Sequence, residues 1–187
     1  MRVRILKATD IRECFSMAQA IKSMKSAFTQ LSEGTAIVPE RVSVNVDAGV
    51  SLYMPAYLPE GGHLAAKIVT VFPKNRAAGF PVIQGVVLVL DSETGEVRAL
   101  MDGSYLTALR TGAASGLATD ILALPDAAVL TVFGAGAQAR TQVEAVRTVR
   151  PIEEIRIVDK SLESAEVFAG EIEGVHVTVM EDSREAV

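Results

Sequence analysis

The sequence contains few of the residues that build disulfides or metal sites. It has 187 residues with one cysteine, Cys14, and two histidines, His63 and His176. A single cysteine cannot form an internal disulfide, which favours a reducing compartment, and no Cys/His cluster has the spacing of a metal site. Neither histidine has a convincing serine or cysteine nucleophile beside it, so a catalytic triad is not indicated. We therefore expect no metal ion and a cytoplasmic location.

Long apolar runs and basic runs are also missing. The longest apolar run, residues 86–90, is far too short to span a bilayer and predicts a buried strand. The N-terminus alternates charge and has no apolar stretch of signal-peptide length. Lys and Arg are scattered, and the formal net charge is −5, which argues against nucleic acid as the main partner. We expect neither a membrane nor a nucleic-acid partner.

What the sequence does contain is one glycine motif in a specific setting. The β-branched run 129–133 continues into G-x-G-x-x-A, and a helical pattern comes next. The first glycine allows a tight turn, the second lets the backbone approach a pyrophosphate, and the small third residue lets helix pack on strand. Asp159 ends the next predicted strand, where an acid accepts from the adenosine ribose hydroxyls. Together these features predict a dinucleotide-binding site.

The remaining periodicity predicts an α+β domain over residues 1–125. Alternation of apolar and polar residues predicts strands near residues 3–6, 42–46, 52–57, 65–71, 82–90 and 97–101. Asp10 followed by Glu13 predicts a helix start, and apolar residues at steps of three and four continue that helix to Leu31 before Gly34. We expect a mostly antiparallel sheet with this flanking helix, followed by a long helix over residues 104–124.

Pro125 ends the long helix, and we place the domain boundary there. Residues 126–187 predict strand 128–133, helix 137–149, strand 155–158, helix 161–172 and strand 175–180, with residues 181–187 beginning a further helix. A complete dinucleotide fold has six strands. The fold class is therefore α/β, with residues 126–187 forming a truncated Rossmann-type half.

Three cationic side chains lie upstream of the glycine motif. Arg41 precedes an alternating strand, Lys67 lies within the apolar segment 65–69, and Arg110 lies among small residues of the long helix. Arg41 fits a solvated strand edge equally well. Lys67 either faces water or is held in a pocket, where burial disfavours its charged form and suits it to proton transfer. Arg110 either pairs with a surface acid or contacts a phosphate or carboxylate.

Several motifs together resemble those of a known family. They are Lys67, Phe72-Pro73-x-Asn75, Gly79-x-Pro81, Asp91-x-x-Thr94-Gly95 and Met101-Asp102-Gly103-x-x-Leu106-Thr107-Ala108-x-Arg110-Thr111-Gly112-Ala113-x-Ser115, followed by Gly134-Ala135-Gly136-Ala137-Gln138-Ala139. Over essentially the whole chain this pattern resembles the ornithine cyclodeaminase/mu-crystallin family. That family includes ornithine cyclodeaminases, an archaeal type of alanine dehydrogenase and ketimine reductases.

The resemblance implies a role for each candidate residue. Lys67 is the implied catalytic residue and, with Arg41, the implied holder of the substrate carboxylate. The implied cofactor-binding residues are Arg110, Thr111, Gly134, Gly136, Ala137, Gln138 and Asp159. An acid at Asp159 favours NAD as cofactor, because it would repel the extra phosphate of NADP.

Two departures from the family pattern bear on these roles. Val82 stands where family members often carry a Ser or Thr that contacts cofactor or substrate. Family chains also run well beyond residue 187, and the aspartate that they use beside the lysine is expected there. For this reason we expect residues 1–187 alone to show no turnover, weak NAD binding and self-association.

The resemblance implies an enzyme acting on a small amino or imino acid. The expected reaction is an NAD-dependent hydride transfer at the α-carbon, carried out by a homodimer. Ornithine cyclodeaminase, which makes proline and ammonia, is the first named activity, and alanine dehydrogenase and ketimine reductase are alternatives. A non-catalytic mu-crystallin-like binding protein, or an inactive fragment, is the competing class. The sequence does not choose the substrate.

Overall fold

Two separate sheets organise the chain, which the structure, a computed structural model, describes over residues 2–187. The contacts divide it into two units. The first unit runs up to Ser16 and resumes over Ser26–Thr107, and the second comprises Met17–Lys25 with Ala108–Val187. We expected a boundary after residue 125, whereas the contacts group residues 108–125 with the second unit. The assignment of separate roles to residues 1–125 and 126–187 stays a prediction.

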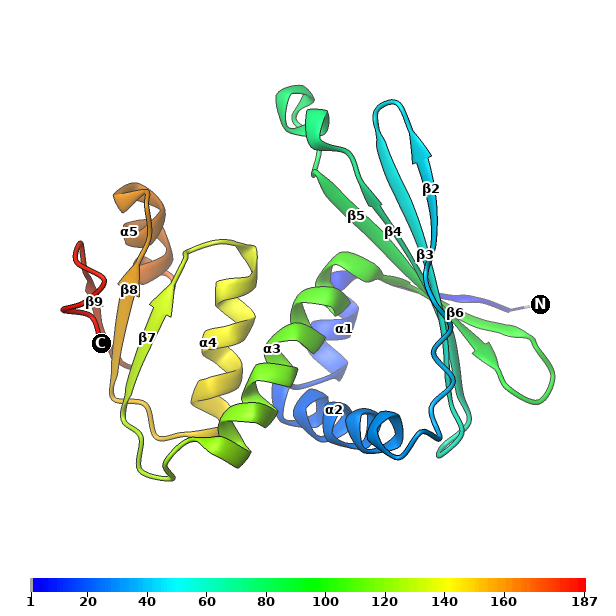
Figure 1. The fold of residues 1–187 in the computed structure, drawn as a ribbon, viewed down its shortest axis with the longest axis horizontal. Coiled ribbons are helices and arrows are strands. Elements are labelled where there is room, and N and C mark those ends of the chain that lie inside the picture. Colours follow the sequence, from blue (N-terminus) through cyan, green and yellow to red (C-terminus); the bar gives the residue numbers. More distant parts are fainter. Residues whose placement is uncertain (1) are drawn as a thin grey trace. The chain divides into compact units, whose positions relative to one another are not determined.

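The first unit is built on a six-stranded sheet with the order β1-β6-β5-β4-β3-β2 (Figure 1). Its strands are β1 (Arg4–Leu6), β2 (Val42–Val46), β3 (Gly49–Leu58), β4 (His63–Val71), β5 (Ile83–Asp91) and β6 (Val97–Asp102). Neighbours are antiparallel except β1, which runs parallel to β6. The mostly antiparallel sheet expected from the alternating pattern is confirmed.

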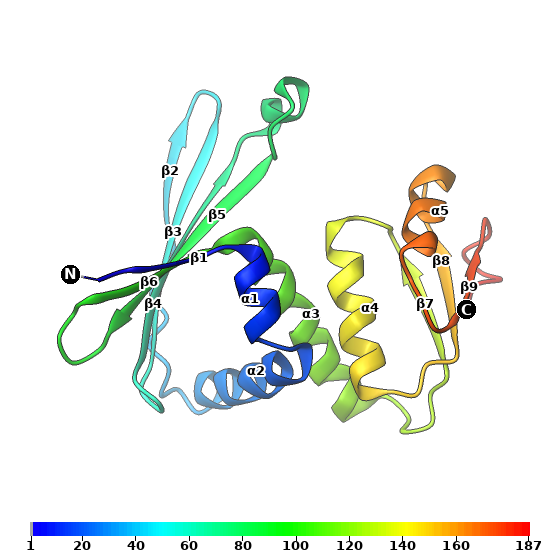
Figure 2. The ribbon, with the colours of Figure 1, turned by 180° about the vertical axis from the view of Figure 1, so that it is seen from behind.

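The helices between β1 and β2 differ from the prediction. The expected single helix is two, α1 (Ala8–Cys14) and α2 (Met17–Ser32), because Phe15 is extended with φ −138° and ψ 104°. Asp10 is not the residue that begins α1. It lies inside the first turn, where its carboxylate accepts a hydrogen bond from the Lys7 amide at 2.8 Å. β1 leads directly into α1 (Figure 2).

A short helix that the sequence pattern did not predict, η1 (Pro73–Ala78), joins β4 to β5. Pro73 opens it with a fixed φ, and Gly79 ends it in the left-handed region at φ 76°. The motif residues Pro73 and Asn75 therefore lie in a turn of helix, where the Asn75 side chain donates to the Pro81 carbonyl at 3.1 Å.

Strand register assigns five exposed apolar residues of the sheet to one face, whereas exposed Ile83 pairs with Val71 on the other. Val42 pairs with Tyr53, and Tyr53 pairs with Ile68. Residues paired across neighbouring strands project to the same side, and side chains alternate sides along a strand. The large apolar residues of this face that are exposed are Ile5, Val42, Val44, Val46 and Tyr53, with exposed fractions between 40% and 70%. We call these five residues the valine face.

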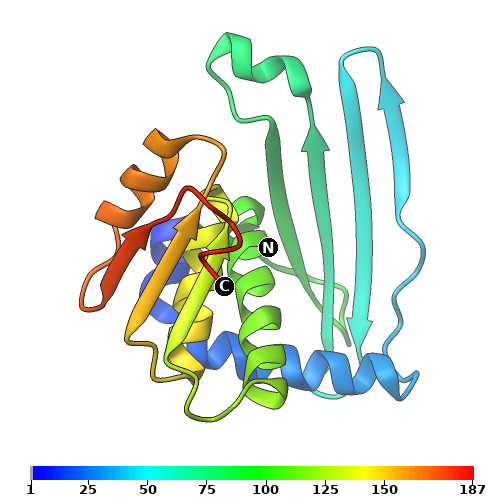
Figure 3. The ribbon, with the colours of Figure 1, turned by 60° about the vertical axis from the view of Figure 1, so that its left-hand side comes forward.

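The second unit contains a parallel sheet of β7 (Val129–Phe133), β8 (Glu154–Val158) and β9 (His176–Val179), in that order (Figure 3). Helix α4 (Ala137–Val149) joins β7 to β8, and α5 (Leu162–Gly170) joins β8 to β9. Strand, helix and strand therefore alternate as predicted for half of a dinucleotide fold. The long helix α3 (Gly103–Leu122) belongs to this unit from Ala108 onwards.

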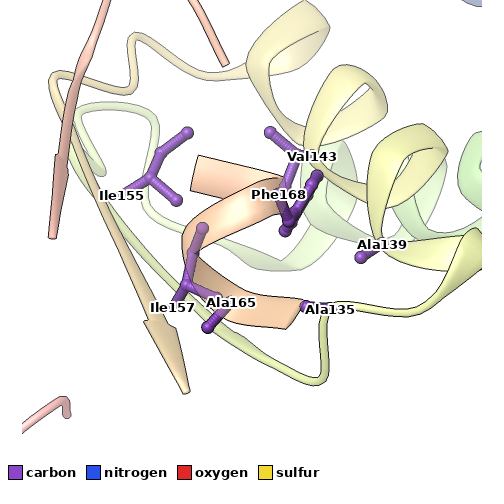
Figure 4. Close-up of a cluster of buried hydrophobic side chains, with 7 residues drawn as sticks. All are labelled: Ala135, Ala139, Val143, Ile155, Ile157, Ala165 and Phe168. Atoms are coloured by element: carbon purple, nitrogen blue, oxygen red, sulfur yellow. The ribbon is translucent and has the colours of Figure 1, made fainter. Parts of the chain in front are cut away.

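The core of the second unit forms where alternate residues of β8 meet the two helices. Ile155 and Ile157 are fully buried, as is Phe168 of α5 at 1% exposure. Small residues allow the close approach: Ala135, Ala139 and Ala165 belong to the same cluster, together with Val143 (Figure 4). Burial of aliphatic and aromatic side chains of this size contributes about 1.5–3 kcal/mol each.

Small residues also bring α3 against α4. A side chain at Gly112 would overlap the Thr141 backbone, and the Thr141 hydroxyl donates to the Ala108 carbonyl at 2.9 Å. Buried Arg150 comes directly after α4 and donates to four carbonyls at the end of α3, those of Thr119, Asp120, Ala123 and Leu124. The bond to Asp120 satisfies one of the last carbonyls of α3, which have no partner within the helix, and the bonds to Ala123 and Leu124 hold the residues that come directly after it. This is why residues 108–125 group with the second unit.

Residues 181–187, expected to begin a helix, form a single turn over residues 183–186, with a hydrogen bond from the Ala186 amide to the Asp182 carbonyl at 3.2 Å. Ala186 is fully buried, and its carbonyl accepts a hydrogen bond from the Thr131 hydroxyl of β7 at 2.6 Å. Thr131 pairs with Arg156, on the side of the parallel sheet opposite Ile155 and Ile157. Across residues 2–187, every helix is too short or too polar to cross a bilayer.

Candidate functional site

The glycine motif forms the turn between β7 and α4 in the second unit. Gly134 comes directly after β7 and adopts φ 101°, a conformation that side chains with a Cβ rarely tolerate. Its amide donates to the Val158 carbonyl at 2.7 Å, which ties the turn to the end of β8. The first glycine of the motif is thus required by backbone geometry.

The second glycine of the motif opens the N-terminus of α4. Gly136 is the N-cap residue, and a Cβ placed there would meet no atom within 4 Å. Ala137 and Gln138, the first residues of α4, are exposed. Amides in the first turn of a helix have no partner within the helix, and they carry the positive end of the helix dipole. The loop therefore presents an open, positively polarised backbone surface that suits a phosphate group.

Asp159 closes the site from the end of β8. One carboxylate oxygen accepts from the Ser161 amide at 2.8 Å, and the other accepts from the Ala135 amide at 2.7 Å. These two backbone hydrogen bonds, first that of Ser161 and then that of Ala135, lower the pKa of Asp159 below its ordinary value. Each carboxylate oxygen can accept a further hydrogen bond, so the side chain can still receive the hydroxyls of a ribose.

An ion pair that the sequence pattern did not predict contacts the backbone carbonyls of the glycine loop. Arg140, on the first turn of α4, donates to the carbonyls of Ala135 and Gly136 and is paired with Glu171 at 2.6 Å. Glu171 lies 31 residues away, just after α5. No local spacing rule links two positions so far apart, so only the fold could reveal the pair.

Arg110 and Thr111 lie on α3, in the part that belongs to the second unit. Arg110 is exposed and Thr111 is partly buried. They come after Ala108, whose carbonyl bonds to Thr141 of α4. The fold thus brings their helix against the helix that begins at the glycine loop, and contact of either residue with a cofactor stays a prediction.

Lys67 and Arg41 lie in the first unit. Lys67 is partly buried in the middle of β4 and pairs with Met54 on one side and Val87 on the other. Its neighbours across the sheet are thus apolar, and it lies on the side opposite the valine face. Exposed Arg41 directly precedes β2 and is separated from β4 by β3, so the two backbones lie about 10 Å apart at ordinary strand spacing. Binding of one substrate carboxylate by both residues stays a prediction.

Two further expectations concern Val82 and metal binding. Val82 directly precedes β5, where its carbonyl accepts from the Phe72 amide at 2.8 Å, so its backbone closes the loop that holds η1. Among the described residues, no group of His, Cys, Asp and Glu is arranged to hold a metal ion.

Comparison with known proteins gives a consistent result. The family model described as the ornithine cyclodeaminase/mu-crystallin family matches residues 1–187. A Δ1-pyrroline-2-carboxylate reductase of Bacillus cereus is 37% identical over 167 residues, covering 88% of this chain and 51% of the relative.

Two solved structures share the fold. That of Thermococcus litoralis Δ1-pyrroline-2-carboxylate reductase with NADH and L-proline has a TM-score of 0.90 and 40% identity, covering 98% of this chain and 58% of the other. An archaeal alanine dehydrogenase dimer with bound NAD has a TM-score of 0.91 and 33% identity, covering 100% of this chain and 58% of the other. The chain thus spans between half and three fifths of the length of these proteins.

The lowered pKa of Asp159 leads to a prediction about stability and pH. In the folded chain the ionised carboxylate is favoured, so it stabilises the fold above the ordinary aspartate pKa of about 3.9, and the contribution is lost as pH falls through the folded-state pKa. At neutral pH we expect Asp159→Asn to have a lower urea midpoint of unfolding than the parent. The difference between the two midpoints should become smaller as the pH is lowered. Circular dichroism measures the unfolding midpoint of each protein at each pH.

The control for this experiment is Asp126→Asn, which changes an exposed aspartate of the same unit. It should unfold with the parent throughout. A gap between Asp159→Asn and the parent that is as wide at about pH 3 as at neutral pH would contradict the assignment of the effect to the ionised carboxylate.

Proposed function

The chain belongs to the ornithine cyclodeaminase/mu-crystallin family, and on this basis we propose that it serves an NAD-dependent conversion of a small α-amino or α-imino acid. The observation that carries the proposal is the sequence of elements from β7 to Asp159: strand, glycine loop, helix, and strand ending in a carboxylate. This order is the dinucleotide-binding arrangement.

NAD is the cofactor that these residues fit. The open backbone at Gly136 and the first amides of α4, at Ala137 and Gln138, suit the pyrophosphate. Asp159 suits the adenosine ribose and disfavours a 2′-phosphate. Relatives of solved structure carry NADH or NAD. When bound, NAD supplies the hydride exchange at the α-carbon.

The cationic residues of the first unit provide the remaining chemistry. Arg41 and Lys67 bind the carboxylate that every α-amino or α-imino acid carries, Arg41 by its planar pair of donors. Lys67, flanked by Met54 and Val87, also holds the proton that an imine nitrogen takes up as its carbon accepts hydride.

Reduction of a cyclic imino acid is the specific reaction that we favour. The relatives at 37% and 40% identity are both named Δ1-pyrroline-2-carboxylate reductases, and one structure contains L-proline. One hydride and one proton convert such a ring imine into an amine. Ornithine cyclisation, the activity expected first from sequence, ends in the same imine reduction and remains the second candidate. A cytoplasmic location agrees with the single cysteine.

We further propose that a second copy of the chain covers the valine face. Soluble monomers seldom expose a broad apolar patch, and such patches mark protein interfaces. Five large apolar residues project from this side of the sheet. One relative of known structure is described as a dimer. The first unit would then provide dimerisation as well as substrate binding.

Replacement of Lys67 tests the enzymatic proposal. Positioned acid–base groups contribute about 10²–10⁴ in rate, so we expect Lys67→Ala in the complete protein to abolish turnover of Δ1-pyrroline-2-carboxylate while NAD binding is nearly unchanged. Absorbance of reduced nicotinamide measures turnover, and calorimetry measures binding. A rate loss below about tenfold in Lys67→Ala would show that Lys67 is structural. A parent protein that binds NAD but converts none of Δ1-pyrroline-2-carboxylate, ornithine and alanine would favour the non-catalytic class.

A charge placed on the valine face tests the dimer. Val44→Asp buries a carboxylate if the face is covered, so the complete protein should sediment as a monomer, while Val167→Asp, at a 58% exposed position of α5, should leave the dimer intact. Analytical ultracentrifugation separates the two species. A Val44→Asp protein that remains dimeric at low concentration would place the interface elsewhere.

A further inference from the structure

Every nitrogen of the Arg140 guanidinium donates to the protein itself. Its Nε and Nη2 donate to the two oxygens of Glu171 at 2.7 and 2.6 Å. Its Nη1 donates to the carbonyls of Gly136 at 3.0 Å and Ala135 at 3.3 Å. These bonds use most of the five donors of the side chain. The carboxylate of Glu171 also neutralises its charge, so Arg140 is poorly placed to bind an anion directly.

Arg140 contacts the carbonyls of two peptides in the glycine loop, and the Gly136 carbonyl also accepts from the Ala139 amide at 3.0 Å. A trans peptide is planar, and its carbonyl and the following N–H point in opposite directions. All described peptides are trans. Because the carbonyls of Ala135 and Gly136 are directed at Arg140, the amides of Gly136 and Ala137 are directed away from it. Those two amides are the ones that a pyrophosphate at this loop would contact.

Arg140 is itself held from two directions. Its guanidinium lies 5.0 Å from the centre of the Phe168 ring, within the range of a cation–π contact. Glu171, just after α5, forms the two-bond pair described above, and this hydrogen bonding lowers the pKa of Glu171. Glutamate, arginine and loop carbonyls thus form one chain of contacts that runs from the end of α5 to the peptides of the loop.

We propose that Arg140, held by Glu171, is a positioning residue that aims the amides of Gly136 and Ala137 at the pyrophosphate of the cofactor. The inference rests on the proposed NAD site and adds to it a residue pair outside the glycine motif. If the inference is correct, loss of Arg140 lowers the affinity for ligands that carry phosphates. It leaves the contacts between the adenosine portion and Asp159 unchanged.

The chain offers a matched control in Arg147. This arginine lies on the same helix and lines the same groove of about 420 Å³ beside Arg140 and Glu171. It also links α4 to the segment after α5, by donating to the Glu173 carbonyl at 3.0 Å. The hydrogen bond that the structure describes for Arg147 goes to Glu173 and does not involve the glycine loop. Arg147→Met therefore removes a comparable structural link while the loop contacts remain.

The experiment measures dissociation constants of NAD, ADP and adenosine by calorimetry on the complete protein and its variants. We expect Arg140→Met to weaken NAD and ADP by about tenfold, the value of two modest hydrogen bonds, and to change adenosine by less than about twofold. Glu171→Gln should have the same pattern with a smaller loss, and Arg147→Met should bind all three like the parent. If Arg140→Met does not fold, Glu171→Gln decides the question.

Several outcomes would overturn the inference. Equal losses for adenosine and ADP would show a general structural role, and no loss at all would show that the loop needs no support from Arg140. If Arg140 contacts the phosphate directly, ADP binding will depend less on salt in Arg140→Met than in the parent, because a charge pair that salt screens is lost. If Arg140 only positions the loop, the salt dependence will be the same in both proteins. A parent protein that binds neither NAD nor ADP would refute the cofactor proposal instead.

Discussion

The hydrogen bond from the Ala135 amide to the Asp159 carboxylate joins the two ends of the nucleotide motif. It connects the turn after β7 to the residue that ends β8, and the bond from Gly134 to Val158 lies directly beside it. β7 and β8 pair in parallel over their whole length, and these two bonds extend the connection from the strands to the loop that follows β7. With the loop fixed at this point, α4 can pack its small residues on Ile155 and Ile157, and its first amides face outward.

The features that depend on local sequence were predicted well. Helix α4 has the bounds expected from its periodicity, and β2 coincides with the alternating valines at 42–46. The features set by distant contacts were not. Ala186 is held by Thr131 in a turn, where the local pattern favoured the start of a helix. Residues 108–125 group with the second unit because Gly112 and Arg150 hold α3 against α4 and its C-terminal end.

The candidate site shows the same division. The glycines, Asp159 and Lys67 could be singled out because residue type and position relative to a strand indicate their chemistry. Arg140 and Glu171 could not, since an exposed arginine and glutamate are ordinary on a helix surface and only tertiary structure brings them together. The roles of Arg41, Lys67 and Arg110 stay predictions, because their significance depends on the ligands that they would contact.

The most direct test of the account is the discrimination between NAD and NADP by the complete protein. We propose that Asp159 decides it, because a carboxylate at the adenosine ribose would repel the 2′-phosphate of NADP. Dissociation constants should show a clear preference for NAD in the parent, and Asp159→Ser should narrow that preference by improving NADP. Equal affinity for both cofactors before and after the substitution would contradict the placement of the ribose at Asp159, and with it the nucleotide site proposed for the second unit.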